Sequence, residues 1–149
     1  MIKKTIILLL AAVVMLTAAG CSTPSMEKSP YEAEQQSADI QMTADEQTLA
    51  GDAESINLTI KNASDKEYTY GAASSIEMEK DGAWYVVEPK EDLMWIEIAY
   101  IIAPRETNEE SVTLNEYYGT LKAGNYRIVK TFTDTDGNGF TAFGPFTVK

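Results

Sequence analysis

From residue 38 onward the chain is a series of short runs in which apolar and polar residues alternate, separated by clusters of turn-forming residues. The clearest run covers residues 54–62, where Ile56, Leu58 and Ile60 alternate with polar residues, so that only one face of the strand is apolar. Only the first twenty residues have the character of a long helix. This pattern predicts an all-β fold, an immunoglobulin-like antiparallel β-sandwich formed by residues 38–149.

About seven strands are expected in such a sandwich. Residues 95–102 are mostly apolar on both faces, which is typical of a central strand. Pro145 lacks an amide donor and predicts that the last strand lies at an edge or contains a bulge. The expected segments are a hairpin over residues 75–87 and strands over residues 39–43, 54–62, 95–102, 111–114, 125–133 and 140–148.

The composition excludes several functional classes. The 149 residues include no histidine and one cysteine, so the chain has no Ser-His-Asp triad, no histidine-ligated metal site and no intrachain disulfide. Its 12 basic and 23 acidic residues give a net charge of −11, whereas binders of nucleic acid need basic patches. Carboxylates are numerous, but no pair stands out with the placement that a glycosidase needs. We therefore expect no enzymatic activity and no nucleic-acid partner.

The N-terminus carries the features of a secretion signal. Lys3 and Lys4 precede an apolar run over residues 6–16, which suits a signal peptide and is too short to cross a bilayer. Small residues then lead directly to Cys21, and this arrangement resembles a bacterial lipobox. The resemblance implies cleavage of residues 1–20, a lipid on the Cys21 sulfur, and a chain anchored to the cell membrane and facing outside the cytoplasm, at the cell surface or in the periplasm. The alternatives are an ordinary secretion signal with a chance cysteine, or an uncleaved membrane segment.

Residues 22–37 separate Cys21 from the predicted domain. They contain two prolines with several Ser, Glu and Gln residues and no apolar period, which predicts a flexible tether. A short helix over residues 31–36 is the alternative. Removal of residues 1–20 takes away two lysines, so the mature chain has a charge of 10 − 23 = −13. An anionic envelope repels this charge, which favours a domain that stands off the membrane.

Three motifs occur in a characteristic order, at residues 76–85 (IEMEKDGAWY), 103–107 (APRET) and 117–128 (YYGTLKAGNYRI). They resemble a family of bacterial Ig-like domains, and the likeness spans most of residues 40–149. Arg105 is a departure, because the family more often has glycine at this position. The resemblance implies an Ig-like fold on a secreted or membrane-anchored protein, and it carries over no activity and no catalytic residue.

The third motif contains the pattern of a tyrosine corner, in which the Tyr126 ring packs inward and its hydroxyl bonds to the backbone a few residues upstream. Ile128 stands where antibody domains place a cysteine, which suits a core without a disulfide. Lys130 shares the parity of Tyr126 and Ile128, so its stem is expected to point inward while its amine reaches water near the strand end. A crosslink between Lys130 and an asparagine is the alternative.

Residues 134–139 match the first half of a calcium-binding loop. Asp134, Asp136 and Asn138 offer the oxygen ligands that calcium prefers. The second half of the motif is absent, because Pro145 occupies the position of the closing glutamate. The same residues also suit a turn between the last two strands. Apart from calcium, no cofactor is expected.

Trp84 follows a turn at residues 81–82, and the length of this turn decides where its side chain lies. A two-residue turn places Trp84 on the face of Glu77, exposed to a sugar ring or a protein partner. A three-residue turn places it opposite Met78 in the core, which is the commoner position for tryptophan in a small sandwich.

Four tyrosines are further candidates for a binding surface. Tyr68 and Tyr70 alternate ahead of a flexible loop, and with Tyr117 and Tyr118 they would form a surface at the loop end, as Ig-like domains often do. Ordinary packing at the rim of the sandwich is the alternative.

The sequence thus predicts a membrane-anchored lipoprotein whose Ig-like module is non-catalytic and binds a protein or glycan partner in the envelope or outside the cell. One alternative is a protease inhibitor that presents the loops after Tyr70 and at residues 134–139 to a protease. The other is a calcium-dependent ligand binder.

Overall fold

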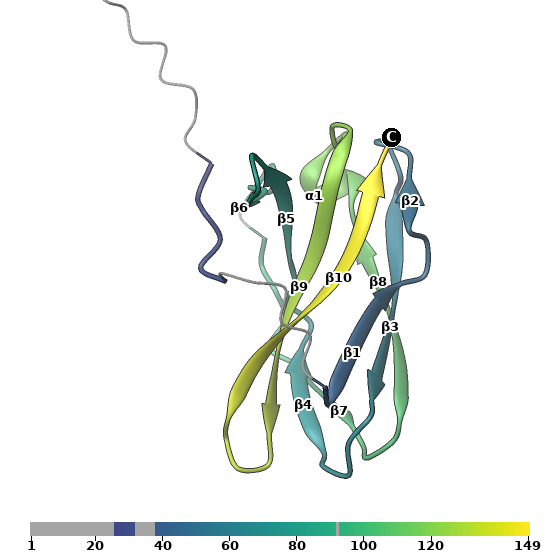
Figure 1. Ribbon diagram of the computed structural model, residues 1–149, viewed down its shortest axis with the longest axis vertical. Coiled ribbons are helices and arrows are strands. Elements are labelled where there is room, and N and C mark those ends of the chain that lie inside the picture. The colour runs from purple at the N-terminus through teal and green to yellow at the C-terminus, as the bar shows by residue number, and fades with distance from the viewer. Residues whose placement is uncertain (1–25, 32–37, 92) are drawn as a thin grey trace, which may run out of the picture.

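The computed structural model describes residues 26–31, 38–91 and 93–149, which form a sandwich of two β-sheets (Figure 1). The smaller sheet has the strand order β1-β3-β8. The larger sheet has the order β2-β10-β9-β4-β7, with β5 paired to β9 and β6 paired to β5. The elements of this part of the chain are β1 (Ile40–Ala44), β2 (Thr48–Leu49), β3 (Ser55–Asn62), β4 (Tyr68–Gly71), β5 (Ser75–Lys80), β6 (Ala83–Val86), β7 (Ala99–Ile102), β8 (Thr107–Thr113), α1 (Asn115–Tyr118), β9 (Gly124–Asp134) and β10 (Gly139–Val148).

The predicted all-β sandwich is confirmed, and the alternation in the sequence explains it. Ile56, Leu58 and Ile60 on β3 are buried between the sheets, while the residues between them face outward. The alternation does not predict β2 and β4. β2 has only two residues, and β4 has only four, so neither is long enough for the period to stand out.

The tyrosine corner is also confirmed. The Tyr126 hydroxyl donates to the Lys122 carbonyl at 2.7 Å, and the ring is buried. It stacks on Phe146 with 5.5 Å between the ring centroids. Ile128 is fully buried on the same face of β9. This corner ties the loop before β9 to the core.

The prediction of a central strand over residues 95–102 is wrong. Within this segment the strand is β7, which lies at the end of the larger sheet and, in the described part of the chain, pairs with β4 and no other strand. Ile102 is buried, but Ile96 is 70% exposed and Ile101 is 57% exposed. The apolar composition of this segment therefore reflects an apolar edge that faces solvent.

The last strand satisfies the constraint set by its proline. β10 pairs with β9 along its whole length, whereas β2 pairs on the other side only with Thr147 and Val148. At Pro145 the outer side of β10 has no partner strand in the described part of the chain, so its missing amide breaks no ladder bond.

Residues 26–31 lie along β6 (Figure 1). The Ser29 amide donates to the Trp84 carbonyl at 2.9 Å, and the Val86 amide donates to the Glu27 carbonyl at 2.8 Å. This part of the segment predicted to be a free tether is therefore held against the domain. We call residues 26–31 the N-terminal strap.

The remaining predictions for the N-terminus fall outside the described residues. These are the signal segment, Cys21 and nearly all of the alternative helix over residues 31–36. Within the described ranges, no helix is long and apolar enough to cross a membrane.

Candidate binding site: the open side of the sandwich

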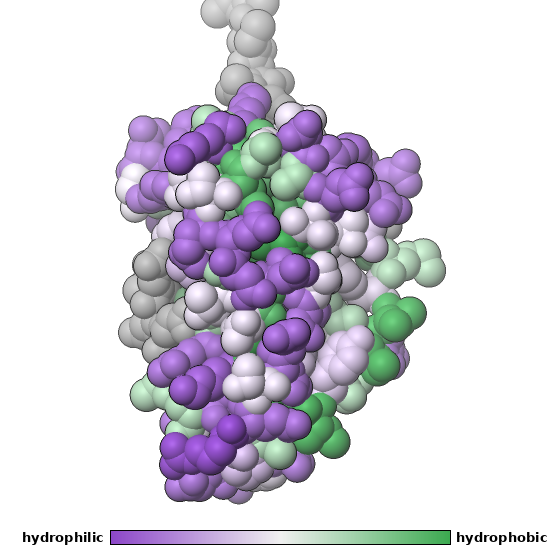
Figure 2. Space-filling view, turned by 90° about the vertical axis from the view of Figure 1, so that its right-hand side faces the viewer, coloured by the Kyte–Doolittle hydropathy of each residue, from purple (hydrophilic) through white to green (hydrophobic). Residues whose placement is uncertain are grey.

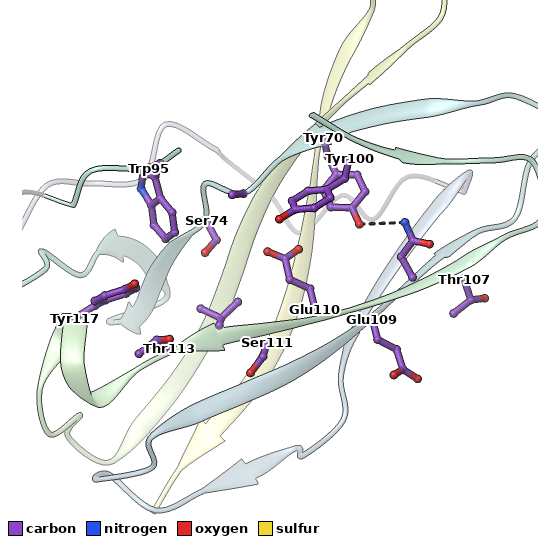
Figure 3. A pocket seen from close by; sticks show the side chains of 13 residues that line it. Tyr70, Ser74, Trp95, Tyr100, Thr107, Glu109, Glu110, Ser111, Thr113 and Tyr117 are labelled. Atoms are coloured by element: carbon purple, nitrogen blue, oxygen red, sulfur yellow. Dashed lines mark hydrogen bonds between the residues drawn. The ribbon is translucent and has the colours of Figure 1, made fainter. Parts of the chain in front are cut away.

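A cleft runs between the two sheets on the side where each sheet ends. β7 is the last strand of the larger sheet, and β8 is the last strand of the smaller one. The cleft between them has a volume of about 860 Å³, and all seven residues of β8 line it. Three aromatic rings line it across from β8, those of Tyr70, Trp95 and Tyr100, and Tyr117 from α1 lines it at the end of β8 (Figure 3). We call this feature the β7–β8 cleft.

The free edge of β8 faces the cleft. At one end of the strand the Glu106 carbonyl accepts from the Asn62 amide, and at the other end the Leu114 amide donates to the Glu54 carbonyl. Since backbone groups of alternate residues point to the same side of a strand, the even-numbered residues of β8 pair with β3. The odd-numbered residues, Thr107, Glu109, Ser111 and Thr113, direct their N–H and C=O groups away from β3.

The edge of β7 is covered in part. The Asn108 amide nitrogen donates to the Ile101 carbonyl at 3.1 Å and to the Tyr70 hydroxyl at 3.1 Å, so Asn108 connects the two sheets at this point. Because the Ile101 carbonyl points away from β4, Ala99 also directs its backbone groups away from β4. Among the described residues, the β8 edge is therefore open along its length, whereas Asn108 occupies part of the β7 edge.

A buried lysine and a glutamate form the floor of the cleft. Lys130 Nζ lies 2.7 Å from Glu110 Oε1, and the two side chains are 1% and 19% exposed. Burial lowers the pKa of Lys130, and the ion pair with Glu110 opposes this shift. Glu110 Oε2 is buried and has no hydrogen-bond partner among the described residues. The expectation that Lys130 reaches water is wrong, because Lys130 lies in the middle of β9 and its amine ends on Glu110.

The aromatic rings of the cleft form two pairs, one beside the Glu110 carboxylate and one farther along the cleft. The rings of Tyr70 and Tyr100 lie with 5.4 Å between their centroids, and Figure 3 shows the Glu110 side chain projecting from β8 toward them. Burial raises the pKa of Tyr70, so its hydroxyl stays protonated. At the far end, Trp95 and Tyr117 meet edge to face at 6.0 Å.

Exposed apolar side chains continue from the cleft onto the surface beside it. They belong to the segment that leads into β7 and to β7 itself: Met94, Trp95, Ile96, Ile98, Tyr100 and Ile101, with exposed fractions between 37% and 96%. Figure 2 shows that hydrophobic side chains on this view of the molecule gather in a few places on a mostly hydrophilic surface. We call these six residues the apolar edge.

The four tyrosines predicted as one surface lie in three different places. Tyr70 and Tyr117 line the cleft. Tyr68 is in the core, where its hydroxyl donates to Asp39 at 2.6 Å. Tyr118 packs against the core, and burial raises its pKa to about 12. The prediction of a single surface is therefore wrong.

Trp84 follows a two-residue turn, because Asp81 and Gly82 both have positive φ angles of 53° and 76° and Trp84 lies opposite Glu79. The core position preferred for a small sandwich is therefore wrong. Trp84 is on the outer face of the larger sheet, but it is only partly exposed, because its ring covers Arg127.

Arg127 is fully buried on this outer face. Its Nε donates to Glu77 Oε2 at 2.7 Å, and its Cζ lies 4.4 Å from the Trp84 ring centroid and 4.1 Å from that of Phe143. The N-terminal strap closes the site, because Tyr31 packs edge to face on Phe143 and its carbonyl accepts a long hydrogen bond from Arg127. The strap and the two rings shield this ion pair from water.

Residues 134–139 connect β9 to β10 as a hairpin turn. Asp134 Oδ1 accepts from the amides of Asp136 and Asn138 at 2.9 and 2.8 Å, and the hydrogen bonds from Asn138 lower the pKa of Asp134. In the described part of the chain, no group of three or more His, Cys, Asp or Glu side chains is placed to hold a metal ion. The turn interpretation describes these contacts, and calcium binding stays a prediction.

Trp95, Tyr100 and Glu110 were not among the residues singled out from the sequence. Their shared cleft depends on β7 and β8 both being sheet ends, which is a property of the topology. The signal that is present is the density of apolar and aromatic residues over 94–101. If this segment is interpreted as an exposed sheet edge instead of a buried strand, it predicts the location of the cleft.

The chain belongs to a family of bacterial Ig-like domains, whose pattern matches residues 36–141. This confirms the resemblance found in the three sequence motifs, and it fits a non-catalytic accessory module. A comparison with curated proteins found no match.

Solved structures with a related arrangement share little sequence with this chain. The periplasmic chaperone SfaE has 10% identity and a TM-score of 0.46, covering 74% of this chain, which spans 56% of the chaperone. The Northeast Structural Genomics Consortium target SoR45 has 14% identity and a TM-score of 0.44, with 76% and 88% of the two chains covered. The PapD-like domain 7 of human CEP192 has 9% identity and a TM-score of 0.41, with 85% and 96% covered.

Proposed function

We propose that this chain is a lipid-anchored, extracytoplasmic binding module without catalytic activity, and that it takes a protein partner at the β7–β8 cleft. The observation that carries the proposal is the apolar edge, which leaves six large hydrophobic side chains between 37% and 96% exposed beside the β7–β8 cleft. Exposed apolar patches of this kind are a signature of protein interaction sites.

The aliphatic character of the apolar edge favours a protein over a glycan. Sugars stack on flat aromatic faces, whereas Ile96, Ile98 and Ile101 offer branched aliphatic surface. Aliphatic and aromatic groups together match the core of a protein–protein interface. The polar residues that line β8 would then supply the hydrogen-bonding rim.

The anchor follows from the arrangement of residues 1–21, which resembles a lipobox, and the strap limits its reach. Four residues lie between Cys21 and Met26, so five Cα–Cα steps of extended chain span at most about 18 Å between the lipid and the strap. Figure 1 shows the strap beside β6 at one end of the larger sheet, with β7 toward the other end. The proposed lipid would therefore hold the β6 end near the membrane and leave β7 directed away from it.

Membrane fractionation tests the anchor. We expect Cys21→Ala to abolish labelling by a radioactive fatty acid and to release the chain from the membrane fraction, because no acyl chain is then attached. The unaltered chain is the control. If the Cys21→Ala chain stays in the membrane fraction to the same extent, the lipid anchor is wrong.

Site-specific crosslinking in the native envelope tests the cleft. A photoreactive amino acid at Ile96 or Ile101 is expected to give the same protein adduct, since both positions lie on the apolar edge. The matched control is Asn57, which is exposed on the outer face of β3 in the other sheet. Equal adducts from Asn57, or none from the apolar edge, would contradict the proposed site.

A further inference from the structure

We infer that the partner occupies the β7–β8 cleft as an extended peptide strand that carries a basic side chain, Lys or Arg, opposite Glu110. This inference rests on the proposed function and specifies the chemistry of its partner. Three observations carry it: the free edge of β8 opens onto the cleft, Glu110 Oε2 lacks a hydrogen-bond partner among the described residues, and Lys130, the cation beside it, contacts the other carboxylate oxygen.

The free edge of β8 defines the shape of the occupant. The four odd-numbered residues of β8 present their N–H and C=O groups to the cleft. The seven residues of β8 extend over about 23 Å, which is the length of a seven-residue strand. An added strand would satisfy these backbone groups and close the open side of the sandwich, which is the mode of binding known as strand addition.

The carboxylate defines the charge of the occupant. Lys130 Nζ donates to Glu110 Oε1 at 2.7 Å and to the Ala72 carbonyl at 3.4 Å, while Glu110 Oε2 is buried without a partner among the described residues. An ionised carboxylate has about four lone-pair sites, so it can hold a second cation or an arginine fork. Among the described residues that line the cleft, the charged ones are Glu109 and Glu110, and the cation in its floor, Lys130, is held by Glu110 Oε1. The mature chain as a whole carries −13, which also attracts a basic segment and repels an acidic one.

The aromatic rings provide the second contact for such a cation. Tyr100 and Trp95 stand on the wall opposite Glu110 (Figure 3), and a cation near the face of an aromatic ring is attracted by the ring quadrupole. The same chain already uses this contact elsewhere, because Arg127 lies between the rings of Trp84 and Phe143. Residues on either side of the basic residue would pack on the apolar edge.

Binding of a matched peptide series tests the inference. The probes are fluorescent seven-residue peptides that alternate threonine and valine and carry Arg, Gln or Glu at the centre, added to the full chain in detergent. We expect the Arg peptide to bind about tenfold more tightly than the Gln peptide, because a charge-assisted hydrogen bond replaces a neutral one. The Glu peptide is expected to bind more weakly than either.

Two variants locate the effect. Glu110→Gln combined with Lys130→Met removes both charges together, so no buried charge is left unpaired, and urea unfolding verifies that the variant is folded. In this variant the Arg and Gln peptides are expected to bind equally. Glu109→Gln is the matched control one residue away on the same strand, and it is expected to change the affinity for the Arg peptide less than about threefold, since rim charges contribute little.

The other outcomes overturn the inference. If the three peptides bind equally, the strand needs no cation. If no peptide binds, but a tetramer of N-acetylglucosamine binds and is lost in Glu109→Gln or the double variant, the cleft is a glycan site. If neither probe binds, an extended basic strand is not the ligand. The crosslinks from Ile96 and Ile101 separate these failures from failure of the proposed function, because they report a partner at the apolar edge whatever its chemistry.

Discussion

Strand β9 carries two buried cations three residues apart, one on each face of the larger sheet. Arg127 and Glu77 on the outer face are 0% and 1% exposed, whereas Lys130 and Glu110 on the inner face are 1% and 19% exposed. Each pair has one ion contact of 2.7 Å, and in each pair one carboxylate oxygen has no hydrogen-bond partner in the described residues. The chemistry of the two pairs is thus similar. What differs is which parts of the protein cover each pair and shield it from solvent.

The covering explains why we assign different roles to the two pairs. The strap, Trp84 and Phe143 enclose Arg127, so no ligand can approach it without displacing the chain's own N-terminal segment. Glu110 instead faces the β7–β8 cleft, where both sheets end. A segment of the chain completes the outer face of the sheet, whereas we propose that a partner completes the inner side.

The largest effect on stability is expected at the enclosed pair, Arg127 and Glu77. Arg127→Met leaves the Glu77 carboxylate buried without a cation, which should lower the free energy of unfolding by about 3–5 kcal/mol. Urea unfolding measures it. The double variant Arg127→Met with Glu77→Leu is the control and should regain most of the loss. If the single and double variants have equal urea midpoints, an unpaired Glu77 carboxylate does not cause the loss of stability, and this prediction is wrong.

A smaller effect on stability is expected at Lys130 and Glu110, the pair that faces the cleft and that we call the open pair. Lys130→Met should lower the free energy of unfolding by about 1–3 kcal/mol, because Glu110 is partly exposed and can be hydrated through the cleft. The same urea titration compares it with Arg127→Met. A loss as large as that of Arg127→Met would mean that the cleft does not admit water, and the comparison between the two pairs would fail.

The open pair should also give a pH signature. Burial lowers the pKa of Lys130 below its ordinary value of 10.5, so between the two pKa values the unfolded chain binds more protons than the folded chain. Stability should therefore rise with pH through this window relative to the Lys130→Met variant, in which this group is absent. Thermal melts of both proteins between pH 8 and about 11 measure the difference, and a constant difference would contradict the lowered pKa.

The smallest effect is expected at a third, exposed pair. Arg105 and Asp65 lie 2.9 Å apart with side chains that are 62% and 86% exposed. Arg105 also has a φ of 65°, in the left-handed region that favours glycine. Arg105→Gly should therefore melt at a higher temperature than Arg105→Ala, since both lose the ion pair and only glycine relieves the backbone. The opposite order would mean that the turn does not hold this φ in solution.

Features that depend on neighbours in the sequence were predictable. The alternation over residues 54–62 follows from the pleat of one strand, and the tyrosine corner joins Tyr126 to a carbonyl only four residues earlier. The turn between β9 and β10 likewise follows from Asp134, Asn138 and Gly137 in one short segment. In each case a few adjacent residues carry the whole signal.

Features that depend on distant strands were missed. The apolar residues over 95–102 are compatible with burial on both faces, and only the pairing of β7 with β4 alone shows that they form an edge. The position of Trp84 depends on the length of the turn before it, because this length sets the register of the hairpin. The partial burial of Trp84 depends on Arg127 from β9 and on the strap. Glu110 meets Lys130 across the two sheets, a contact that no spacing along the chain indicates.

The sequence alone determined the all-β class, the membership in a bacterial Ig-like family, the acidic charge and the tyrosine corner, because each is recorded in composition or in residues close together in the chain. The tertiary structure decided which strands are sheet ends, which buried cation is enclosed and where the apolar edge meets the cleft. These depend on the order in which strands pair, and strand order is set by packing summed over the whole molecule and not by any one segment.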